Sequence, residues 1–314
     1  MTSTETSAGD VTIRPLTEGD FESVVALDRR ITGNARRGYF EQRLKAALRQ
    51  PKRHLQLAAT TTSGLCGFVL ARAAGGEYGR QEEVLALETV GVDPDTQHAG
   101  LGRRMMVDLE ALSRARGIES VVTQVEWKNH GMLRFLDGAK FNLAPLQILE
   151  RRVHRMPLPE TDEEIEKQPP LVRHLREGDL EMVCRIDRQV TGRDRTEYLK
   201  RKVDEALHES AIAVSLVAED DGFVVGFGMV RVDYGNYGHV EPTASLDTIG
   251  VNPGFAHKGF ARAILTQMID NLSALHVERL ETEVAREDFD LLRFLYRFGF
   301  GPSSRLPFFR KLGS

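Results

Sequence analysis

One stretch that occurs twice in the chain is the main indication of its fold. The first copy reads Val90-Gly91-Val92-Asp93-Pro94-Asp95-Thr96-Gln97-His98-Ala99-Gly100-Leu101-Gly102-Arg103-Arg104. The second copy begins 159 residues later and reads Ile249-Gly250-Val251-Asn252-Pro253-Gly254-Phe255-Ala256-His257-Lys258-Gly259-Phe260-Ala261-Arg262-Ala263. Each copy runs from a short apolar segment through a proline-containing turn to a glycine and a periodic apolar segment. This order predicts a strand, a turn and the N-terminus of a helix.

The same offset of 159 residues holds along most of the 314-residue chain. Residues 14–20 recur at 173–179, Gly67-Phe68 recurs as Gly226-Phe227, and Phe141 recurs as Phe300. Solenoid repeats have periods of roughly 20–50 residues, which is far shorter. The offset therefore indicates a duplicated domain whose halves share one fold.

Each half predicts the same order of elements. A strand and a helix are followed by a break at a Thr-Gly pair, a second helix and two strands. A fourth strand then enters the glycine turn and a long helix, and a strand, a short helix and a final strand complete the unit. We expect the fourth strands at Val84–Val92 and Ala244–Val251, and the long helices at Leu101–Ala115 and Phe260–Ala274. The fold class is α/β (α+β), with a mixed, mostly antiparallel sheet flanked by helices in each half.

Proline and acidic residues mark a linker between the halves. We assign residues 1–155 to the first domain, with 1–10 as a loose tail, 156–170 to the linker and 171–314 to the second domain. Prolines limit helix and strand, and the acidic run favours water. We expect two halves docked side by side, and we expect fragments 1–155 and 168–314 each to melt cooperatively.

Composition excludes several classes of protein. Charged residues make up 28% of the chain, apolar residues 41%, and the net charge is -4, which describes an ordinary globular protein and not a basic nucleic-acid binder. We expect no membrane contact and a cytoplasmic location, because the sequence has no apolar run of membrane-spanning length and no signal pattern at its start. Cys66 and Cys184 give no disulfide framework, and the nine histidines show no paired metal spacing, so we expect no metal.

The glycine turn has the properties of an anion site. Small residues allow a ligand to approach the backbone, and the free N–H groups and dipole of a helix N-terminus attract negative charge. Basic side chains stand in the same place, Arg103 and Arg104 in the first copy and Lys258 and Arg262 in the second. A dinucleotide fingerprint would need glycine at Met105, and a P-loop would need Gly-Lys-Ser/Thr, so neither applies.

The strand ending in V-x-P and the following Q/R-x-x-G-x-G/A resemble the coenzyme-binding signature of the GNAT superfamily of acyl-CoA N-acyltransferases. The resemblance implies that the pyrophosphate of acetyl-CoA docks on the amides of residues 98–102 and that pantetheine runs along the fourth strand. The implied coenzyme contacts in the first half are Val90, Val92, Gln97, His98, Ala99, Gly100, Leu101, Gly102, Arg103 and Asn129. Those in the second half are Ile249, Val251, His257, Lys258, Gly259, Phe260, Ala261 and Arg262. The alternative is a turn of purely structural importance.

Both halves depart from the family pattern. A tyrosine that serves the thiolate leaving group is expected on the short helix, where this chain has Leu136 and Leu295. Tyr296 comes one residue late, which is a rotation of about 100° on a helix. Ala256 replaces Gln97, and Asp288 replaces Asn129, so we expect the first half to be the stronger coenzyme site.

Two acids are candidates for the general base that an ammonium acceptor requires. Glu88 and Asp247 stand two residues before Val90 and Ile249. Strict alternation puts all four side chains on one face of their strands, directed at the central cleft. The alternative is that each acid is a solvated strand-end residue or caps the turn. The catalytic hypothesis is that Glu88 or Asp247 acts as the base and Tyr296 as the acid.

The connection between the first two helices repeats as well. Arg36 and Arg195 lie where family members often cover the acceptor, and they equally suit ion pairs with Asp28 and Asp187 that serve the fold.

The sequence thus predicts an N-acetyltransferase that moves an acetyl group from acetyl-CoA to a primary amine by direct attack. The acceptor, a protein lysine or a small molecule, is left open, as is the oligomeric state. The alternative is a non-catalytic acyl-CoA-binding regulatory or scaffold protein, which the missing tyrosines favour.

Overall fold

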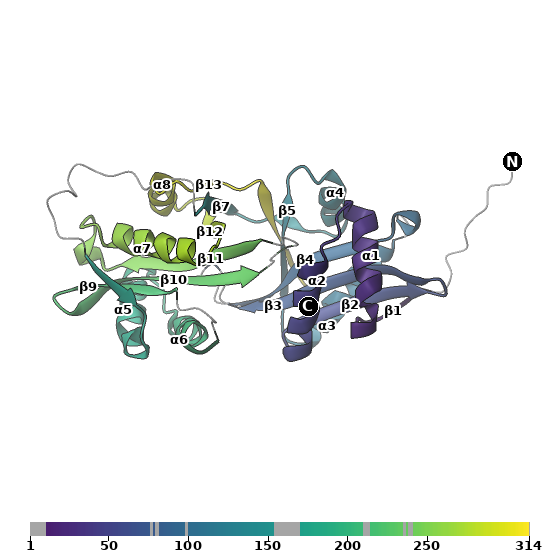
Figure 1. Ribbon diagram of the computed structural model, residues 1–314, viewed down its shortest axis with the longest axis horizontal. Helices are drawn as coiled ribbons and strands as arrows, with labels where there is room; N and C mark the ends of the chain where they lie inside the picture. The colour runs from purple at the N-terminus through teal and green to yellow at the C-terminus, as the bar shows by residue number, and fades with distance from the viewer. Residues whose placement is uncertain are drawn as a thin grey trace.

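The computed structural model describes residues 11–75, 78, 82–97, 100–153, 170–209, 214–234, 237 and 241–313. Residues 1–10, the linker up to residue 169, and His98 and Ala99 lie outside the described residues. Figure 1 shows two lobes side by side, each with a twisted sheet and flanking helices.

The two halves repeat one order of elements. The first half contains β1 (Thr12–Pro15), a 3-10 turn (Glu18–Asp20), α1 (Phe21–Thr32), α2 (Arg37–Arg49), β2 (His54–Thr61), β3 (Gly64–Gly75), β4 (Glu83–Val92), a 3-10 turn (Pro94–Thr96), α3 (Leu101–Ala115), β5 (Ser120–Glu126), α4 (His130–Gly138), β6 (Asn142–Leu143) and β7 (Leu146–Arg152). The second half contains β8 (Leu171–His174), a 3-10 turn (Glu177–Asp179), α5 (Leu180–Thr191), α6 (Thr196–Asp204), a π-helical turn (Glu205–Glu209), β9 (Leu216–Asp220), β10 (Phe223–Tyr234), β11 (Pro242–Val251), a 3-10 turn (Pro253–Phe255), α7 (Phe260–Ala274), β12 (Arg279–Ala285), α8 (Phe289–Arg297), β13 (Gly301–Pro302) and β14 (Arg305–Lys311).

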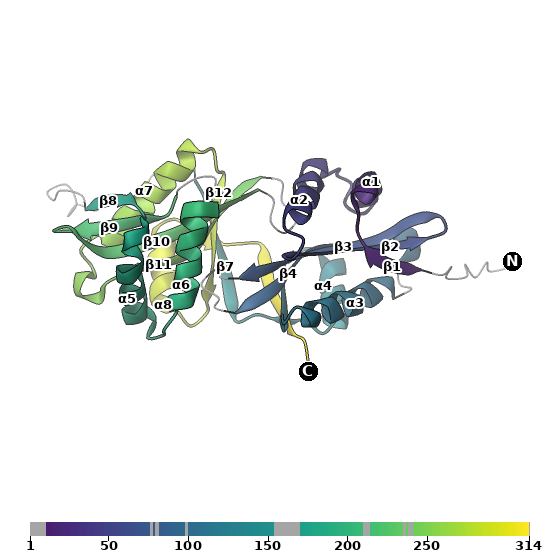
Figure 2. The same cartoon turned by 90° about the horizontal axis from the view of Figure 1, so that it is seen from below.

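Apolar faces of the helices hold each sheet between two layers. Helix α3 buries Leu101, Met105, Met106 and Leu109 against the first sheet. Helices α1 and α2 pack on the opposite face, around Tyr39, Phe40 and Phe68. Figure 2 shows α1 and α2 on one side of this sheet and α3 and α4 on the other. The second half repeats the arrangement, with α5 and α6 on one face and α7 and α8 on the other.

Both sheets have seven strands, and the expected fold class is confirmed. Their orders are β1-β2-β3-β4-β5-β14-β6 and β13-β7-β12-β11-β10-β9-β8. Pairing is antiparallel except between β4 and β5 and between β11 and β12, which are parallel.

The halves exchange their last long strands. Strand β14 comes from the second half and pairs with β5 of the first, and β7 comes from the first half and pairs with β12 of the second. The expectation that each final strand completes its own unit is therefore wrong. Because β7 and β14 are equivalent in the repeat, either can form the same ladder on either sheet, and the sequence pattern does not distinguish the two connections.

Within the described ranges, no helix is both long and apolar enough to cross a membrane. The same ranges contain no group of three or more His, Cys, Asp or Glu side chains placed to hold a metal ion.

Candidate functional site

Each sheet opens between its two parallel strands. Strand β4 pairs with β5 at Leu85–Val121 and Ala86–Val122, and then continues to Val92 beyond this pairing. At the point of separation, the Thr123 hydroxyl donates a hydrogen bond to the Leu87 carbonyl at 2.8 Å. The Thr282 hydroxyl does the same for the Leu246 carbonyl at 2.8 Å between β12 and β11. A V-shaped opening with polar strand edges therefore leads to the glycine turn in each half.

The turn after β4 is fixed by side chains that bond to backbone. The Asp93 carboxylate accepts the Asp95 N–H at 3.0 Å, and the Gln97 amide donates to the Val92 carbonyl at 3.1 Å. In the second half, Asn252 takes the place of Asp93 and accepts the Gly254 N–H at 3.0 Å. These bonds fix the backbone that directly follows each strand.

Gly100 and Gly259 begin the two long helices in the left-handed region. Their φ angles are +78° and +86°, which any residue with a Cβ adopts at a cost of roughly 1–2 kcal/mol. A Cβ built on either glycine meets nothing within 4 Å, so the backbone is open to a ligand. The following N–H groups have no partner within the helix, which makes the turn suitable for an anion.

The expected basic residues surround these turns and have partners of their own. Arg103 donates to the Gly138 carbonyl at 3.2 Å, and Arg104 donates to the Val11 carbonyl at 3.2 Å. In the second half, the Lys258 ammonium lies 4.7 Å from the centre of the Phe255 ring, and the Arg262 guanidinium lies 6.0 Å from that of Phe298.

The remaining coenzyme residues divide between core and turn. Val90, Val92, Ile249 and Val251 are partly buried against the α3 and α7 sides of their sheets, and Leu101 and Phe260 are buried. His257 has a positive φ of 61°, and Ala261 is half-buried. Asn129 caps α4 by accepting the Met132 N–H at 3.1 Å, and Asp288 caps α8 by accepting the Leu291 N–H at 3.1 Å. The two caps are thus equivalent in the fold.

Gly102 has a packing role that sequence reading missed. A Cβ at this position would lie 2.9 Å from Cε2 of Phe135 on α4. The glycine therefore lets α3 and α4 approach closely, whatever ligand binds at the turn.

A β-bulge moves Glu88 away from the face expected for it. The register of β3 and β4 passes from Leu70–Thr89 to Ala71–Leu87 and leaves Glu88 as the extra residue. Val90 packs on the α3 side, whereas Glu88 forms ion pairs with Arg43 of α2 at 3.2 Å and Arg72 of β3 at 2.9 Å. The expectation that Glu88 and Val90 share one face is wrong, because a bulge interrupts the alternation of side chains.

Asp247 has the same environment in the second half. The register of β10 and β11 skips Asp247, and the adjacent Ile249 packs on the α7 side. The Asp247 carboxylate lies 2.8 Å from the Lys202 ammonium and 3.9 Å from Arg231 Nε. Lys202 and Arg231 are the repeat equivalents of Arg43 and Arg72. A buried carboxylate between two cations is thus a repeated feature, and it joins the second helix of each half to the sheet.

Tyr296 and the leucines beside it occupy different environments. Leu136 and Leu295 are completely buried, so the positions expected for the tyrosine belong to the core. Tyr296 is 42% exposed, and its hydroxyl accepts a hydrogen bond at 3.0 Å from Gln147 of the exchanged strand β7.

The expected ion pairs at the helix connection are present. Arg36 donates through Nε to Asp28 at 3.0 Å, and Arg195 donates through Nε to Asp187 at 2.9 Å. The guanidiniums also lie 5.4 Å and 5.0 Å from the ring centres of Tyr39 and Tyr198. These contacts support the structural interpretation of the repeated arginines.

One tyrosine from each half reaches the other half. The Tyr78 N–H donates to Asp247 at 3.0 Å, and the Tyr78 hydroxyl donates to Glu281 at 3.0 Å. Loss of hydration, together with the charges of Glu281 and Glu283, raises the pKa of Tyr78 well above its usual value. Its equivalent, Tyr237, packs against an apolar cluster on the first sheet that contains Ala86, Val122 and, from the exchanged strand β14, Phe309.

A buried polar network connects the two sheets. Gln124 and Glu283 are equivalent in the repeat and form a hydrogen bond of 2.7 Å with each other. Arg305 donates to Gln124 at 2.7 Å and forms an ion pair with Glu281. Sequence reading missed this network, although its signal is visible as polar residues in otherwise apolar strands. The matching face of the first half is apolar, because Ala86 and Val122 stand where the second half has Ser245 and Glu281.

Comparisons with known proteins agree with this geometry. The model of the acetyltransferase (GNAT) family matches residues 21–141 and 180–300. A GCN5-related N-acetyltransferase from Sphaerobacter thermophilus is 14% identical, with a TM-score of 0.66 over 97% of this chain and 96% of that one. The tandem GNAT protein from the clavulanic acid biosynthesis pathway is 14% identical, with a TM-score of 0.63 over 97% and 99%.

A glucosamine N-acetyltransferase region of a fungal multi-domain β-N-acetylglucosaminidase gives a TM-score of 0.69 at 13% identity, over 97% of this chain and 38% of that one. No curated protein matches the sequence. At these identities the structural likenesses show the fold alone, whereas the family model covers most of both halves. The chain therefore belongs to the GNAT family of acetyltransferases and carries two such domains in tandem.

Proposed function

We propose that this protein transfers an acetyl group from acetyl-CoA to a primary amine by direct attack. The observation that carries the proposal is the opening between β4 and β5 beside the glycine turn, repeated between β11 and β12. An extended pantetheine chain finds free strand edge in such an opening, and the pyrophosphate finds N–H groups at the helix N-terminus. The contacts assigned above to residues 90–103 and 249–262 are part of this proposal.

Catalysis in this arrangement rests on alignment and on stabilisation of charge. The amine attacks the thioester carbonyl while backbone N–H groups near Val90 or Ile249 stabilise the developing oxyanion. Glu88 and Asp247 remain the proposed bases. Both carboxylates lie on the side of the sheet where α2 and α6 pack, which is the side that the resemblance assigns to the acceptor. Tyr296 is proposed as an acid of the second half alone.

The first experiment measures binding and turnover on the intact chain. Calorimetry with coenzyme A tests the binding site, and a thiol-release assay with acetyl-CoA and a panel of amines and lysine peptides tests transfer. The double variant G100E/G259E is the control, because it places bulk and negative charge at both turns. Absence of coenzyme binding by the wild-type chain would contradict the whole proposal.

A second candidate function is coenzyme binding without turnover. Complete burial of Leu136 and Leu295 favours it, because neither half offers a hydroxyl at that position to protonate the leaving thiolate. This alternative predicts normal coenzyme binding and no amine-dependent thiol release across the panel. Amine-dependent release that is abolished in G100E/G259E would exclude it.

A further inference from the structure

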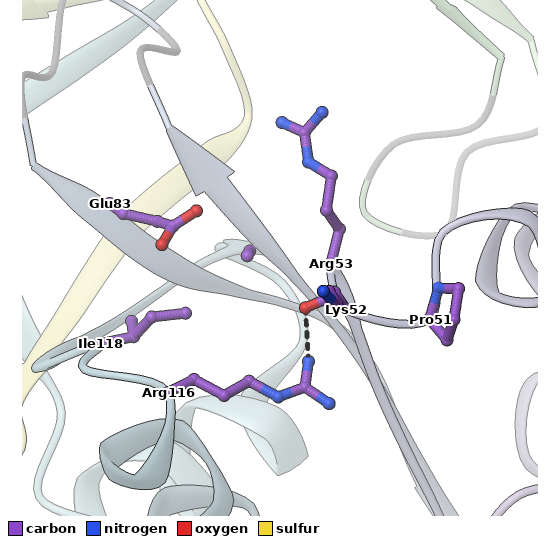
Figure 3. A pocket seen from close by; sticks show the side chains of 7 residues that line it. Pro51, Lys52, Arg53, Glu83, Arg116 and Ile118 are labelled. Atoms are coloured by element: carbon purple, nitrogen blue, oxygen red, sulfur yellow. Dashed lines mark hydrogen bonds between the residues drawn. The ribbon is translucent and has the colours of Figure 1, made fainter.

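A cavity in the first half has three cationic side chains among the residues that line it. It has a volume of about 560 Å³, within the range typical of small-molecule sites. Lys52, Arg53 and Arg116 supply three cations to its lining, and Glu83 supplies one acid. Figure 3 shows these side chains around an open space, with Glu83 across from the turn that carries Lys52 and Arg53.

The position of the cavity separates it from the coenzyme turn. Its lining comes from the turn between α2 and β2, from Ala73 on β3, from the first residue of β4 and from the segment after α3. The glycine turn lies at the opposite ends of β4 and α3. A helix of 15 residues, the length of α3, spans about 22 Å. A ligand of ordinary metabolite size therefore does not contact both places.

Hydrogen bonds fix one of the cations at the wall. Arg116 donates through Nη1 to the Lys52 carbonyl at 2.7 Å and to the His54 carbonyl at 3.1 Å. A guanidinium has five N–H donors, and these two bonds involve one of its three nitrogens. Arg53 is 40% exposed, and its guanidinium lies 3.9 Å from the carboxylate of Glu205 in the second half.

Four guanidiniums lie close enough to His54, beside the cavity, to affect its pKa. Burial, and after it the charges of Arg43, Arg72, Arg53 and Arg116, together lower the pKa of His54 to about 4. His54 is consequently neutral near pH 7 and adds no charge. Its depressed pKa reports that several guanidiniums act on this end of the strand pair.

We propose that this cavity binds a small polyanion carrying phosphate or carboxylate groups, at a site independent of the coenzyme turns. Lys52, Arg53 and Arg116 bind the anionic groups, and arginine suits the planar, bidentate contacts that both groups offer. Pro51, Ala73 and Ile118 provide an apolar wall for the carbon skeleton of the ligand.

The test is calorimetric titration of the full chain with inorganic pyrophosphate and, separately, with citrate. The variant K52Q/R53Q removes two cations while leaving Arg116, which holds the turn, in place. The variant R29Q/R193Q removes the same charge from exposed helix-end and loop positions elsewhere. The variant G100E/G259E removes anion binding at the coenzyme turns.

We expect at least one of the two anions to bind, and its Kd to rise about tenfold or more in K52Q/R53Q. The Kd is expected to change less than about threefold in R29Q/R193Q and in G100E/G259E. Binding of pyrophosphate alone or of citrate alone identifies the class of ligand. No binding of either anion, equal affinity in K52Q/R53Q, or loss confined to G100E/G259E would overturn the proposal. Coenzyme binding is measured in parallel, so failure of this site is distinct from failure of the acetyltransferase proposal.

Discussion

At the residue scale, a single inserted position controls where the buried acids lie. The bulge at Glu88 directs its carboxylate to Arg43 and Arg72 while Val90 stays with the α3 layer. Burial of an ion pair is costly, but removal of one partner is costlier, because the remaining charge is left without compensation. Glu88 therefore supports the fold, whatever its part in chemistry.

Replacement of Glu88 by glutamine is expected to lower the free energy of unfolding by about 3–5 kcal/mol. The amide keeps the shape of the side chain but leaves two guanidiniums without their counterion. Urea denaturation measures the effect. The matched control is Glu41→Gln on the exposed face of α2, where the ion pair with Lys45 contributes less than about 1 kcal/mol. A loss below about 1 kcal/mol in Glu88→Gln would contradict the structural role, and lost activity in a stable variant would favour the base.

Two substitutions at Gly100 distinguish the effect of backbone strain on coenzyme binding from the effect of charge. Gly100→Ala places a Cβ in open space at a strained φ, so it is expected to change coenzyme affinity only a few-fold. Gly100→Glu adds a negative charge where the pyrophosphate is proposed to lie and should weaken binding more than tenfold. Gly259→Glu should have the smaller effect, because Gln97 supplies a polar contact that Ala256 lacks. Calorimetry with coenzyme A decides, and a larger effect of Gly259→Glu would reverse the order of the two sites.

At the element scale, one carboxylate organises the entry to each first helix. Asp20 accepts hydrogen bonds from Arg14 at 2.7 Å and from the Thr17 N–H and hydroxyl at 2.8 Å. Asp179 repeats the contacts with Arg173 and the Arg176 N–H. The hydrogen bonds from Arg14, with those from Thr17, hold the pKa of Asp20 well below its usual value.

The sign of this shift gives a pH-dependent prediction. The pKa of Asp20 is lower in the folded chain than in the unfolded one. Its contribution to the free energy of unfolding is therefore complete at pH values above the unfolded pKa of about 3.9, and it is lost as the pH falls below that value towards the folded pKa. Asp20→Asn should therefore cost about 2 kcal/mol or more at pH 7 and clearly less at pH 3. The exposed neighbour Glu18→Gln is the control. Urea unfolding at both pH values checks the prediction, and an equal cost at both would contradict it.

The sequence was enough to predict the helices and strands, but not the bulge within β4 or the close packing of α3 against α4. Hydrophobic periodicity and the glycine turns placed β4, α3, β11 and α7 within a residue or two of their observed bounds, because local sequence determines these features. The bulge was missed because strict alternation was assumed, although the apolar residues on the α3 side change phase across it, from Leu85 and Leu87 to Val90 and Val92. The packing of Gly102 against Phe135 was also not predicted, because it depends on a residue 33 positions away in the sequence.

At the scale of the whole molecule, strand exchange and the polar network make the halves interdependent. Strand β14 forms seven register pairs with β5, and β7 forms seven with β12. Gln124 of β5 forms hydrogen bonds with Glu283 of β12 and with Arg305 of β14, and so connects the two sheets. The exchange was beyond sequence reasoning, because β7 and β14 satisfy the same pairing on either sheet.

The exchange changes what is expected of separated halves. Fragment 1–155 lacks the strand that lies between β5 and β6, and it carries β7 without the sheet that β7 joins. An unpaired strand and an open sheet edge promote association, and two copies of one fragment can exchange β7 in the way that domain-swapped dimers do. We therefore expect fragments 1–155 and 168–314 to self-associate when each is expressed alone, and to form a 1:1 complex with one cooperative melt when they are expressed together. Light scattering after size exclusion measures the masses. The control is the full chain with a protease site in the linker, which should keep its mass and its melting temperature after cleavage. Two monomeric fragments that each melt cooperatively near the temperature of the full chain would show that the exchange contributes little to stability.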